Sequence, residues 1–357
     1  MKITFFSFMI LIVVAGCSKE TTDNKNDSSL QKQQTSQGLI PTNPNEITLI
    51  ESAVRKEWLE IAAKSAALFA AKDFDKLEEL ANQYRTSKEC FDTGIWKLEA
   101  VYFGIVPSSD KSDEEWKMSL ATLHDWIRTK PNSITARVAL AGTLVDYGWK
   151  ARGSDYAKNV SDTGWKLLGE RLSEAVQVLK QAGNLSEKCP HYWTVMLEAA
   201  MGLSANKSQY ETLFQKAIAS EPDFTGYYCQ KAYYLSPRWG GQPGDMEVFL
   251  EGAANQVGGE NGDLLYARVA WYVQLLTRDV FDDHGLSWER TDKGFEVLEK
   301  LYPNSIHVQN GRAYMAVMGC EKTLAPRRLI LALHGQIDPK DWTSKENFIR
   351  LTHTYNP

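Results

Sequence analysis

Apolar residues in the body of this chain recur at helical spacing. One face of residues 46–71 carries an apolar series, whose members are Ile50, Val54, Trp58, Ile61, Ala62, Leu68 and Phe69. Such spacing predicts an amphipathic helix. After a short turn at residues 72–75, a second helical series follows at Leu77, Leu80, Ala81 and Tyr84. Two helices joined by so short a turn pack antiparallel, as a hairpin.

A recurring junction separates the helices that follow. The tetrapeptide Pro-Asn-Ser-Ile stands at residues 131–134 and again at 303–306, each time before a helical pattern, while Pro222-Asp223 is a third case and Pro190-His191 a weaker fourth. Proline disfavours the helical conformation in the residue before it. Asn, Asp or Ser beside it can cap the next helix. These junctions therefore predict helix boundaries.

The spacing of the junctions indicates an irregular repeat. Pro190 and Pro222 are 32 residues apart, close to the helix–turn–helix unit of about 34 residues in tetratricopeptide arrays. The other intervals, 59 and 81 residues, correspond to about two such units with insertions. Units of this kind cannot bury their apolar faces alone, so they stack. We predict an all-α, tetratricopeptide-like solenoid of helical hairpins.

The first residues follow a different pattern. Lys2 precedes an apolar run from Ile3 to Val14 that is broken only by Thr4 and Ser7. Its length of about 12 residues suits the core of a signal peptide and is too short for a membrane-spanning helix. The run ends in Val-Ala-Gly-Cys at residues 14–17, which resembles the bacterial lipobox. We predict a signal peptide at 1–16 and a lipid on Cys17; the alternatives are an ordinary signal peptide with a chance cysteine, or an uncleaved anchor.

Residues 17–45 are polar and predict a flexible tether between the lipid and a helical domain at 46–357, because such a composition buries too little apolar surface to fold. Several acyl chains on one cysteine anchor a protein stably to a membrane. In the lipoproteins that this start resembles, Asp after the cysteine retains the protein in the inner membrane. Ser18 stands there instead, so we expect the outer membrane, with the domain facing the periplasm.

The charge of the chain limits the kinds of partner that it can bind. The net charge of −5, with no basic patch interleaved with aromatic residues, argues against nucleic acid as a partner.

Four cysteines remain after lipidation, and we favour free buried thiols in helices over disulfides; they are Cys90, Cys189, Cys229 and Cys320. The repeat register separates Cys189 from Cys229 by about 12 Å along the helix axes. A disulfide needs about 7 Å or less, so this pair is predicted to be unbonded.

Several short segments carry a resemblance to a known family. They include Tyr-Gly-Trp-Lys-Ala-Arg-Gly at 147–153 and Pro-Arg-Trp-Gly-Gly at 237–241, together with 69–80, 94–98 and 262–269. Combined with the Pro-Asn-Ser junction, they resemble the bacterial domain-of-unknown-function family 4034 over roughly residues 65–335. The resemblance implies a tetratricopeptide-like helical fold. It implies no activity and no catalytic residues.

Two sets of residues are candidates for ligand binding. The pattern Gly-Gly-x-x-Gly-Asp occurs at 240–245 and at 258–263; glycines at helix ends and capping aspartates explain it, and a shared anion or metal site is the sharper alternative. Arginine and tryptophan can hold a carboxylate, a sugar or a peptide end. The combined candidate set is Trp149, Arg152, Arg238, Trp239, Asp245, Asp263 and Arg268. The alternative is that these arginines pair with nearby acids and join neighbouring helices.

No catalytic motif, cofactor site or metal site is predicted. Asp282-Asp283-His284 indicates a surface loop rather than a metal site, and the other histidines, His307 among them, are isolated in the sequence. The leading hypothesis is a membrane-anchored lipoprotein whose helical-repeat domain binds a protein or peptide, or acts as a scaffold, in the cell envelope. Alternatives are an envelope enzyme acting on peptidoglycan or glycan through carboxylates near residues 238–268, and a small-ligand sensor.

The lipobox yields the first prediction. Cys17→Ala removes the only thiol at the cleavage site, so we expect the variant to incorporate no labelled palmitate and to leave the membrane fraction. Palmitate labelling and membrane fractionation of both forms measure this. A variant that still matures and stays membrane-bound would contradict the lipid anchor.

Overall fold

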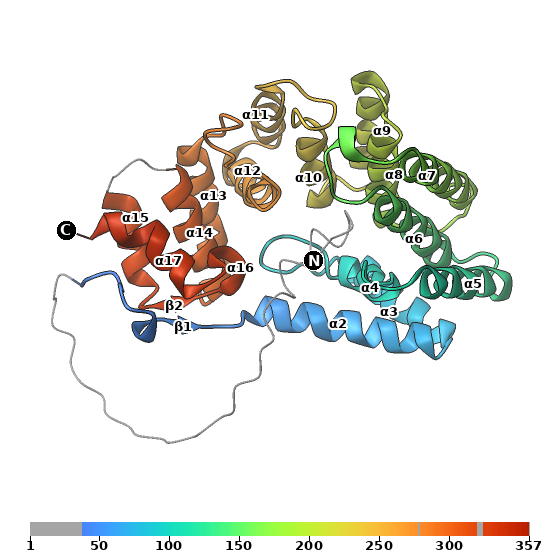
Figure 1. The fold of residues 1–357 in the computed structure, drawn as a ribbon, viewed down its shortest axis with the longest axis horizontal. Coiled ribbons are helices and arrows are strands. Elements are labelled where there is room, and N and C mark those ends of the chain that lie inside the picture. The colour runs from blue at the N-terminus through green and yellow to red at the C-terminus, as the bar shows by residue number, and fades with distance from the viewer. Residues whose placement is uncertain (1–37, 278, 320–323, 357) are drawn as a thin grey trace, which may run out of the picture.

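The computed structural model describes residues 38–277, 279–319 and 324–356, so Cys17, the lipobox and Cys320 lie outside the described residues. Within the described residues, sixteen α-helices account for most of the chain, and the strands form one sheet of two short members. The predicted all-α architecture is therefore confirmed. Figure 1 shows the helices following one another around a ring.

The first half of the ring contains nine helices. They are α2 (Ala53–Ala70), α3 (Phe74–Ser87), α4 (Lys97–Ile105), α5 (Asp113–Thr129), α6 (Ile134–Arg152), α7 (Asp162–Ala182), α8 (His191–Gly202), α9 (Lys207–Ser220) and α10 (Thr225–Tyr234). The second half contains α11 (Asp245–Val257), α12 (Gly259–Gln274), α13 (Trp288–Leu301), α14 (Ile306–Gly319), α15 (Leu324–Ala332), α16 (Pro339–Trp342) and α17 (Lys345–Thr352). The strands are β1 (Thr48–Leu49) and β2 (Gln336–Ile337).

The proline junctions mark helix starts, as the sequence predicts. Ser133 caps α6, because its hydroxyl accepts a hydrogen bond from the backbone N–H of Ala136 at 2.8 Å. Ser305 does the same for α14, accepting from the N–H of Val308 at 3.1 Å. Each bond satisfies one backbone donor that has no partner within the helix. The identical tetrapeptides therefore perform the same local task at two distant places.

Neighbouring helices pack closely because small residues face backbone on the next helix. At Gly104 of α4, an added Cβ would stand 2.2 Å from the carbonyl oxygen of Ala62 in α2. At Gly294 of α13, it would stand 2.1 Å from the carbonyl oxygen of Asp263 in α12. Both approaches need glycine, and they hold α2 on α4 and α13 on α12. One continuous apolar core runs through these pairs.

The start of the folded body differs from the prediction. The tether was expected to reach residue 45 and the first helix to begin at 46. Instead, residues 38–45 belong to the folded body, with the side chain of Ile40 buried, and α2 begins only at Ala53. Ser52 ends the extended segment and caps α2. The segment is polar in composition, but Ile40 and Ile47 are buried against the C-terminal part of the chain and so attach it to the folded body.

The two ends of the described chain meet at what we term the seam, the packing of residues 38–50 on the C-terminal segments. Strand β1 pairs in parallel with β2, so that Thr48 lies opposite Gln336. The amide side chain of Asn356 accepts from the N–H of Ile40 at 2.8 Å and donates to its carbonyl at 3.0 Å. A second apolar core fills the seam; its buried members are Ile40, Ile47, Ala313, Ile330, Leu333, Ile337, Trp342 and Phe348. The seam closes the row of helices into the ring of Figure 1.

Three of the four remaining cysteines lie in the described residues, and all three are free thiols. The prediction that Cys189 and Cys229 are unbonded is therefore confirmed. Both thiols are buried, but only Cys229 lies in a helix, since Cys189 precedes α8. The sulfur of Cys189 lies 3.2 Å from the hydroxyl oxygen of Tyr102.

The seam can be tested by removing one side chain from its core. Ile47 is 2% exposed, and Ile47→Ala leaves a cavity that costs about 2–5 kcal/mol of unfolding free energy. Leu49 in the same segment is 47% exposed, so Leu49→Ala is the control and costs about 0.5 kcal/mol or less. Urea unfolding compares the two. Equal destabilisation by both substitutions would contradict a packed seam.

Candidate functional site

The arginines and tryptophans proposed from the sequence separate into two groups. Trp149, Arg152, Arg238 and Trp239 meet beyond the end of α6. The guanidinium of Arg152 lies 5.9 Å from the centroids of the Trp149 and Trp239 rings, and that of Arg238 lies 5.6 Å from Trp239. Arg268 belongs to α12 and lines a pocket instead. The structure thus brings together four members of the predicted set.

Arg152 contacts backbone carbonyls and aromatic rings, whereas the alternative from the sequence paired these arginines with acids. One terminal nitrogen of Arg152 donates to the carbonyl of Gly153 at 2.9 Å and to that of Asp155 at 2.8 Å. The same guanidinium packs over Trp239, from the loop before α11. A charge shared between backbone carbonyls and aromatic faces fixes the loop after α6.

The two predicted aspartates pair with cations outside the candidate set. Asp245 accepts from the ammonium of Lys207 at 2.5 Å, and Asp263 accepts from the guanidinium of Arg290 at 3.1 Å. Gly244 and Gly258 have positive φ, as expected for glycines at helix ends. The expectation that both aspartates cap a following helix is wrong. Gly244 is the N-cap residue of α11, and α12 begins at Gly259, which places Asp263 inside the helix.

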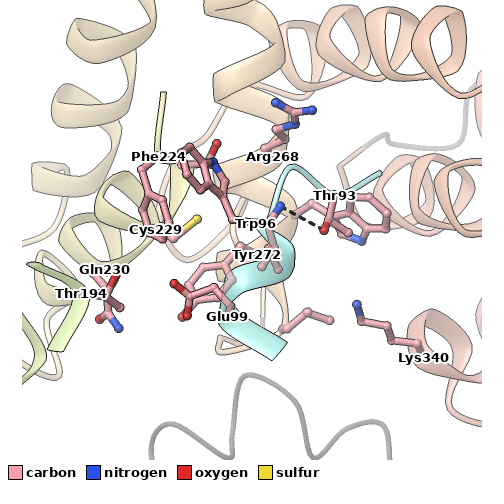
Figure 2. Close-up of a pocket in the computed structure, with 15 residues that line it drawn as sticks. Thr93, Trp96, Glu99, Thr194, Phe224, Cys229, Gln230, Arg268, Tyr272 and Lys340 are labelled. Carbon is pink, nitrogen blue, oxygen red and sulfur yellow. Dashed lines mark hydrogen bonds between the residues drawn. The ribbon is translucent and has the colours of Figure 1, made fainter. Parts of the chain in front are cut away.

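A partly enclosed pocket lies inside the ring, with a cavity volume of about 50 Å³. Its walls come from the segment around α4 and from α8, α10, α12 and α16 (Figure 2). The polar lining residues are Thr93, Glu99, Thr194, Thr225, Gln230, Arg268 and Lys340. The aromatic ones are Trp96, Phe224, Trp271 and Tyr272. A mostly apolar cavity with a few convergent polar groups is the usual form of a small-molecule site.

Arg268 reaches the pocket across a glycine. Gly94, in the turn before α4, has φ of +83°, and an added Cβ would stand 2.4 Å from Nε of Arg268. The guanidinium therefore packs directly on this turn. Its Nε is buried without a hydrogen-bond partner. Burial lowers the pKa of Arg268 below its usual range, opposed by the nearby hydroxyl of Tyr302, yet an arginine stays charged under these conditions.

Buried acids stand behind one wall of the pocket. The carboxylate of Glu99 lies 2.9 Å from Nδ1 of His191, and both side chains are buried. The imidazole stacks on Tyr102 with centroids 4.3 Å apart. Next to them, burial and then the carboxylate of Asp146 raise the pKa of Glu198 well above its ordinary value. Glu198 does not line the pocket, so Glu99 with its histidine partner is the acid of this group that faces it.

The same wall contains two side chains with unused hydrogen-bonding capacity. Thr194 is 3% exposed and Gln230 is 4% exposed. Neither the hydroxyl of Thr194 nor the amide oxygen of Gln230 has a hydrogen-bond partner among the described residues. Burying such groups unpaired is costly, so their presence in a cavity wall points to a partner that the protein itself does not supply.

His307 has no partner nearby in the sequence, but the fold brings two carboxylates to its side chain. Its Nδ1 lies 3.1 Å from an oxygen of Asp338 and 3.7 Å from one of Asp341. Its Nε2 lies 3.4 Å from the ammonium of Lys340, which lines the pocket. The indole N–H of Trp271 donates to the other oxygen of Asp341 at 3.1 Å. This network fixes Lys340 at the pocket wall.

The geometry of His307, Asp338 and Asp341 also fits a metal ion, because one ligand atom from each lies within 4.8 Å of the others. Lys340 decides against that interpretation. An ammonium has donors only, so its approach to Nε2 requires a lone pair there and places the imidazole proton on Nδ1. That proton is donated to Asp338 and the lone pair on Nε2 accepts from Lys340, so neither nitrogen of the imidazole is free to bind a metal. We therefore interpret the cluster as a hydrogen-bond network.

Sequence reasoning identified one polar residue of the pocket, Arg268. The others come from segments between Thr93 and Lys340, and each sits alone in a helical pattern. Residues 94–98 were noted in the sequence only as part of the family resemblance, and no binding role was predicted for them. Five segments that are distant in the sequence form the pocket, so no local motif marks its residues. They can be identified only from the folded structure.

Comparison with known protein families, with curated proteins and with solved structures yields no match to this chain. The resemblance to family 4034 thus stays an expectation. Within the described residues, no helix has both the length and the hydropathy that crossing a bilayer requires.

The network around His307 predicts a pH effect on stability. Burial raises the pKa of Asp341 to about 6 from 3.8. A raised pKa in the folded state means that the protonated acid stabilises the fold, and that this stabilisation is lost as the pH rises from about 4 to about 6. Asp341→Asn stays neutral. Across this range we expect the stability of the variant to gain about 3 kcal/mol relative to the parent.

Urea unfolding at several values between about pH 4 and pH 7 measures this difference. The exposed Asp282 provides the control, since Asp282→Asn should follow the parent at every pH. Parallel profiles for Asp341→Asn and the parent would contradict the buried titration.

Proposed function

We propose that this chain is a lipid-anchored binding protein of the bacterial cell envelope, which holds its ligand in the pocket inside the helical ring. The pocket is the observation that supports a binding function. Its cavity is partly enclosed and mostly apolar, yet Thr194 and Gln230 present unpaired polar atoms in its wall. Groups so placed cost stability unless a ligand pairs with them.

The location is proposed from the N-terminal sequence. The lipobox at residues 14–17 puts a lipid on Cys17, and Ser18 favours the outer membrane with the domain in the periplasm. A peptide or protein partner remains part of this proposal, with a chain end as the piece that enters the pocket. A small cavity suits a small molecule or a terminus better than a continuous peptide.

The glycan-hydrolase alternative has less support from the geometry. It places paired carboxylates near residues 238–268, where Asp245 and Asp263 are engaged by Lys207 and Arg290. Within the described pocket lining, Glu99 is the one carboxylate. Glycoside hydrolysis generally uses two, about 5–10 Å apart. The small-ligand alternative, in contrast, gains a specific cavity.

Plugging the pocket tests the proposal. Ile95 lines the cavity and is half-buried at its edge, so Ile95→Trp fills the space. Full-length protein in detergent is incubated with the small-molecule fraction of cell envelopes, and the retained molecules are identified by mass spectrometry after ultrafiltration. We expect the parent to retain a molecule that Ile95→Trp does not.

Met118→Trp is the matched control, because Met118 is exposed on α5, outside the pocket. It should retain the molecule as the parent does. If no molecule is retained by the parent, or if Ile95→Trp retains it equally, the pocket is not the binding site.

A further inference from the structure

A cluster of buried polar side chains joins three helices beside the pocket. His307 lies on α14, Asp338 is the N-cap residue of α16, and Asp341 lies within α16. One nitrogen or oxygen atom from each of the three lies within 4.8 Å of the others, and all three side chains are buried. Trp271 of α12 donates its indole N–H to Asp341 at 3.1 Å. The cluster therefore connects α16 to both α12 and α14.

The cluster contains too few donors for two ionised carboxylates. Nε2 of His307 accepts from the ammonium of Lys340 at 3.4 Å, so the imidazole has one N–H, on Nδ1, which it donates to Asp338 at 3.1 Å. Asp338 also accepts from the backbone N–H of Lys340 at 2.9 Å. One oxygen of Asp341 has no hydrogen-bond partner and lies 3.7 Å from the same Nδ1. A buried carboxylate with an unpaired oxygen is destabilised when it ionises.

We propose that a proton on Asp341 holds α16 against α12 and α14, and that loss of this proton toward neutral pH loosens α16. The pocket is affected because the cluster holds two of its lining residues, Lys340 through His307 and Trp271 through Asp341. Protonation would thus control one wall of the cavity, whatever ligand the cavity holds.

The charges nearest to Asp341 set the range of this titration. Burial raises the pKa of Asp341 to about 6, opposed by His307 and Lys340 and supported by the negative charge of Asp338. Burial acts in the same direction on Asp338, but its hydrogen bond with His307 outweighs burial and the pKa of Asp338 is lowered. Asp338 is therefore already ionised where Asp341 titrates. Ionisation of Asp341 adds a second negative charge to a buried cluster.

Groups from the other packed elements leave this balance in place. Trp271 of α12 carries no charge, and burial raises the pKa of Tyr314 on α14, so that both stay neutral below about pH 8. Asp279, after α12, and Arg350, on α17, act on Tyr314 with opposite sign. Within the described residues, the cost of ionising Asp341 is therefore met inside the cluster.

The shortness of α16 makes it the element that responds. It has four residues, and the backbone N–H groups of Trp342 and Thr343 bond to Asp338 and Pro339 at 3.2 Å and 2.9 Å. So short a helix has little stability of its own and depends on its side-chain contacts. Trp342 stays attached, because it is fully buried and donates to Asn310 at 2.8 Å. We therefore expect more frequent local opening of α16 and not its permanent release.

Hydrogen exchange followed by mass spectrometry tests this on full-length protein in detergent. Exchange of the backbone amides in residues 336–343 is measured from about pH 4 to about pH 7 and divided by the intrinsic rate at each pH. The carboxyl titrates near 3.8 when exposed and near 6 in the fold, so we expect the corrected rate to increase about fiftyfold over this range and to level off above it.

Urea distinguishes local opening from global unfolding. At pH 7, exchange in residues 336–343 should be faster than in α6 and insensitive to low concentrations of urea, because a local opening exposes little surface. Exchange in α6 should increase with urea. Equal rates and equal urea dependence in the two segments would overturn the proposal, because the titration would then act on the whole fold.

Variants assign the titration to Asp341. Asp341→Asn cannot ionise, so its corrected exchange in residues 336–343 should stay nearly constant with pH. Asp282→Asn, which removes an exposed acid outside the cluster, should follow the parent. If Asp341→Asn does not fold, Asp338→Asn takes its place: without the second negative charge, the increase should begin at lower pH. A parent whose corrected exchange is constant or decreases with pH would also overturn the proposal, and none of these results bears on whether the pocket holds a ligand.

Discussion

The structure depends on the burial of a few N-terminal side chains against the C-terminal segments. Helical hairpins that stack in a row leave two free ends and an open inner face. Here Ile40 and Ile47 fill a core made by the last helices, and β1 pairs with β2. The row therefore closes. Lys340, near the end of the chain, lines the same cavity as Glu99 and Thr194.

The pocket wall contains an acid and two cations that are not paired with one another. Acids and cations at exposed positions pair at once with neighbours, as Asp245 does with Lys207. Inside the ring, Glu99 is paired with His191 and Lys340 with His307, each from the outer side of the cavity. These histidines anchor the charged groups and leave them available toward the cavity. Rigid supporting partners of this kind position a binding site before the ligand enters it.

Local physics made much of the fold predictable. The helical periodicity, the capping serines at the two identical junctions and the short turn after α2 depend only on neighbouring residues, and the prediction from them is confirmed. The unbonded state of Cys189 and Cys229 followed from helix geometry alone. The seam could not be predicted in this way, because Ile40 sits in a polar segment and gains its burial from residues about 300 positions away.

The candidate site was harder to predict for the same reason. Of the seven candidates from the sequence, Trp149, Arg152, Arg238 and Trp239 meet at the end of α6, while the other three lie elsewhere. Their contacts, however, bind loops to helices. The pocket depends on Thr194, Gln230 and His307, whose types are ordinary in a helix. Only the absence of a partner for the first two, and the proximity of Asp338 for the third, distinguishes them.

The position of the seam has a mechanical consequence. If a lipid holds Cys17 in a bilayer, any pulling force between the membrane and the domain enters the fold at residue 38. The first structure to bear that load is the pairing of β1 with β2 and the packing of Ile40 and Ile47. A sufficient force would peel this segment away before it reaches α2. The ring would then open where its two ends meet, while α16, which carries Lys340, would stay attached to α12 and α14 through Asp341 and His307.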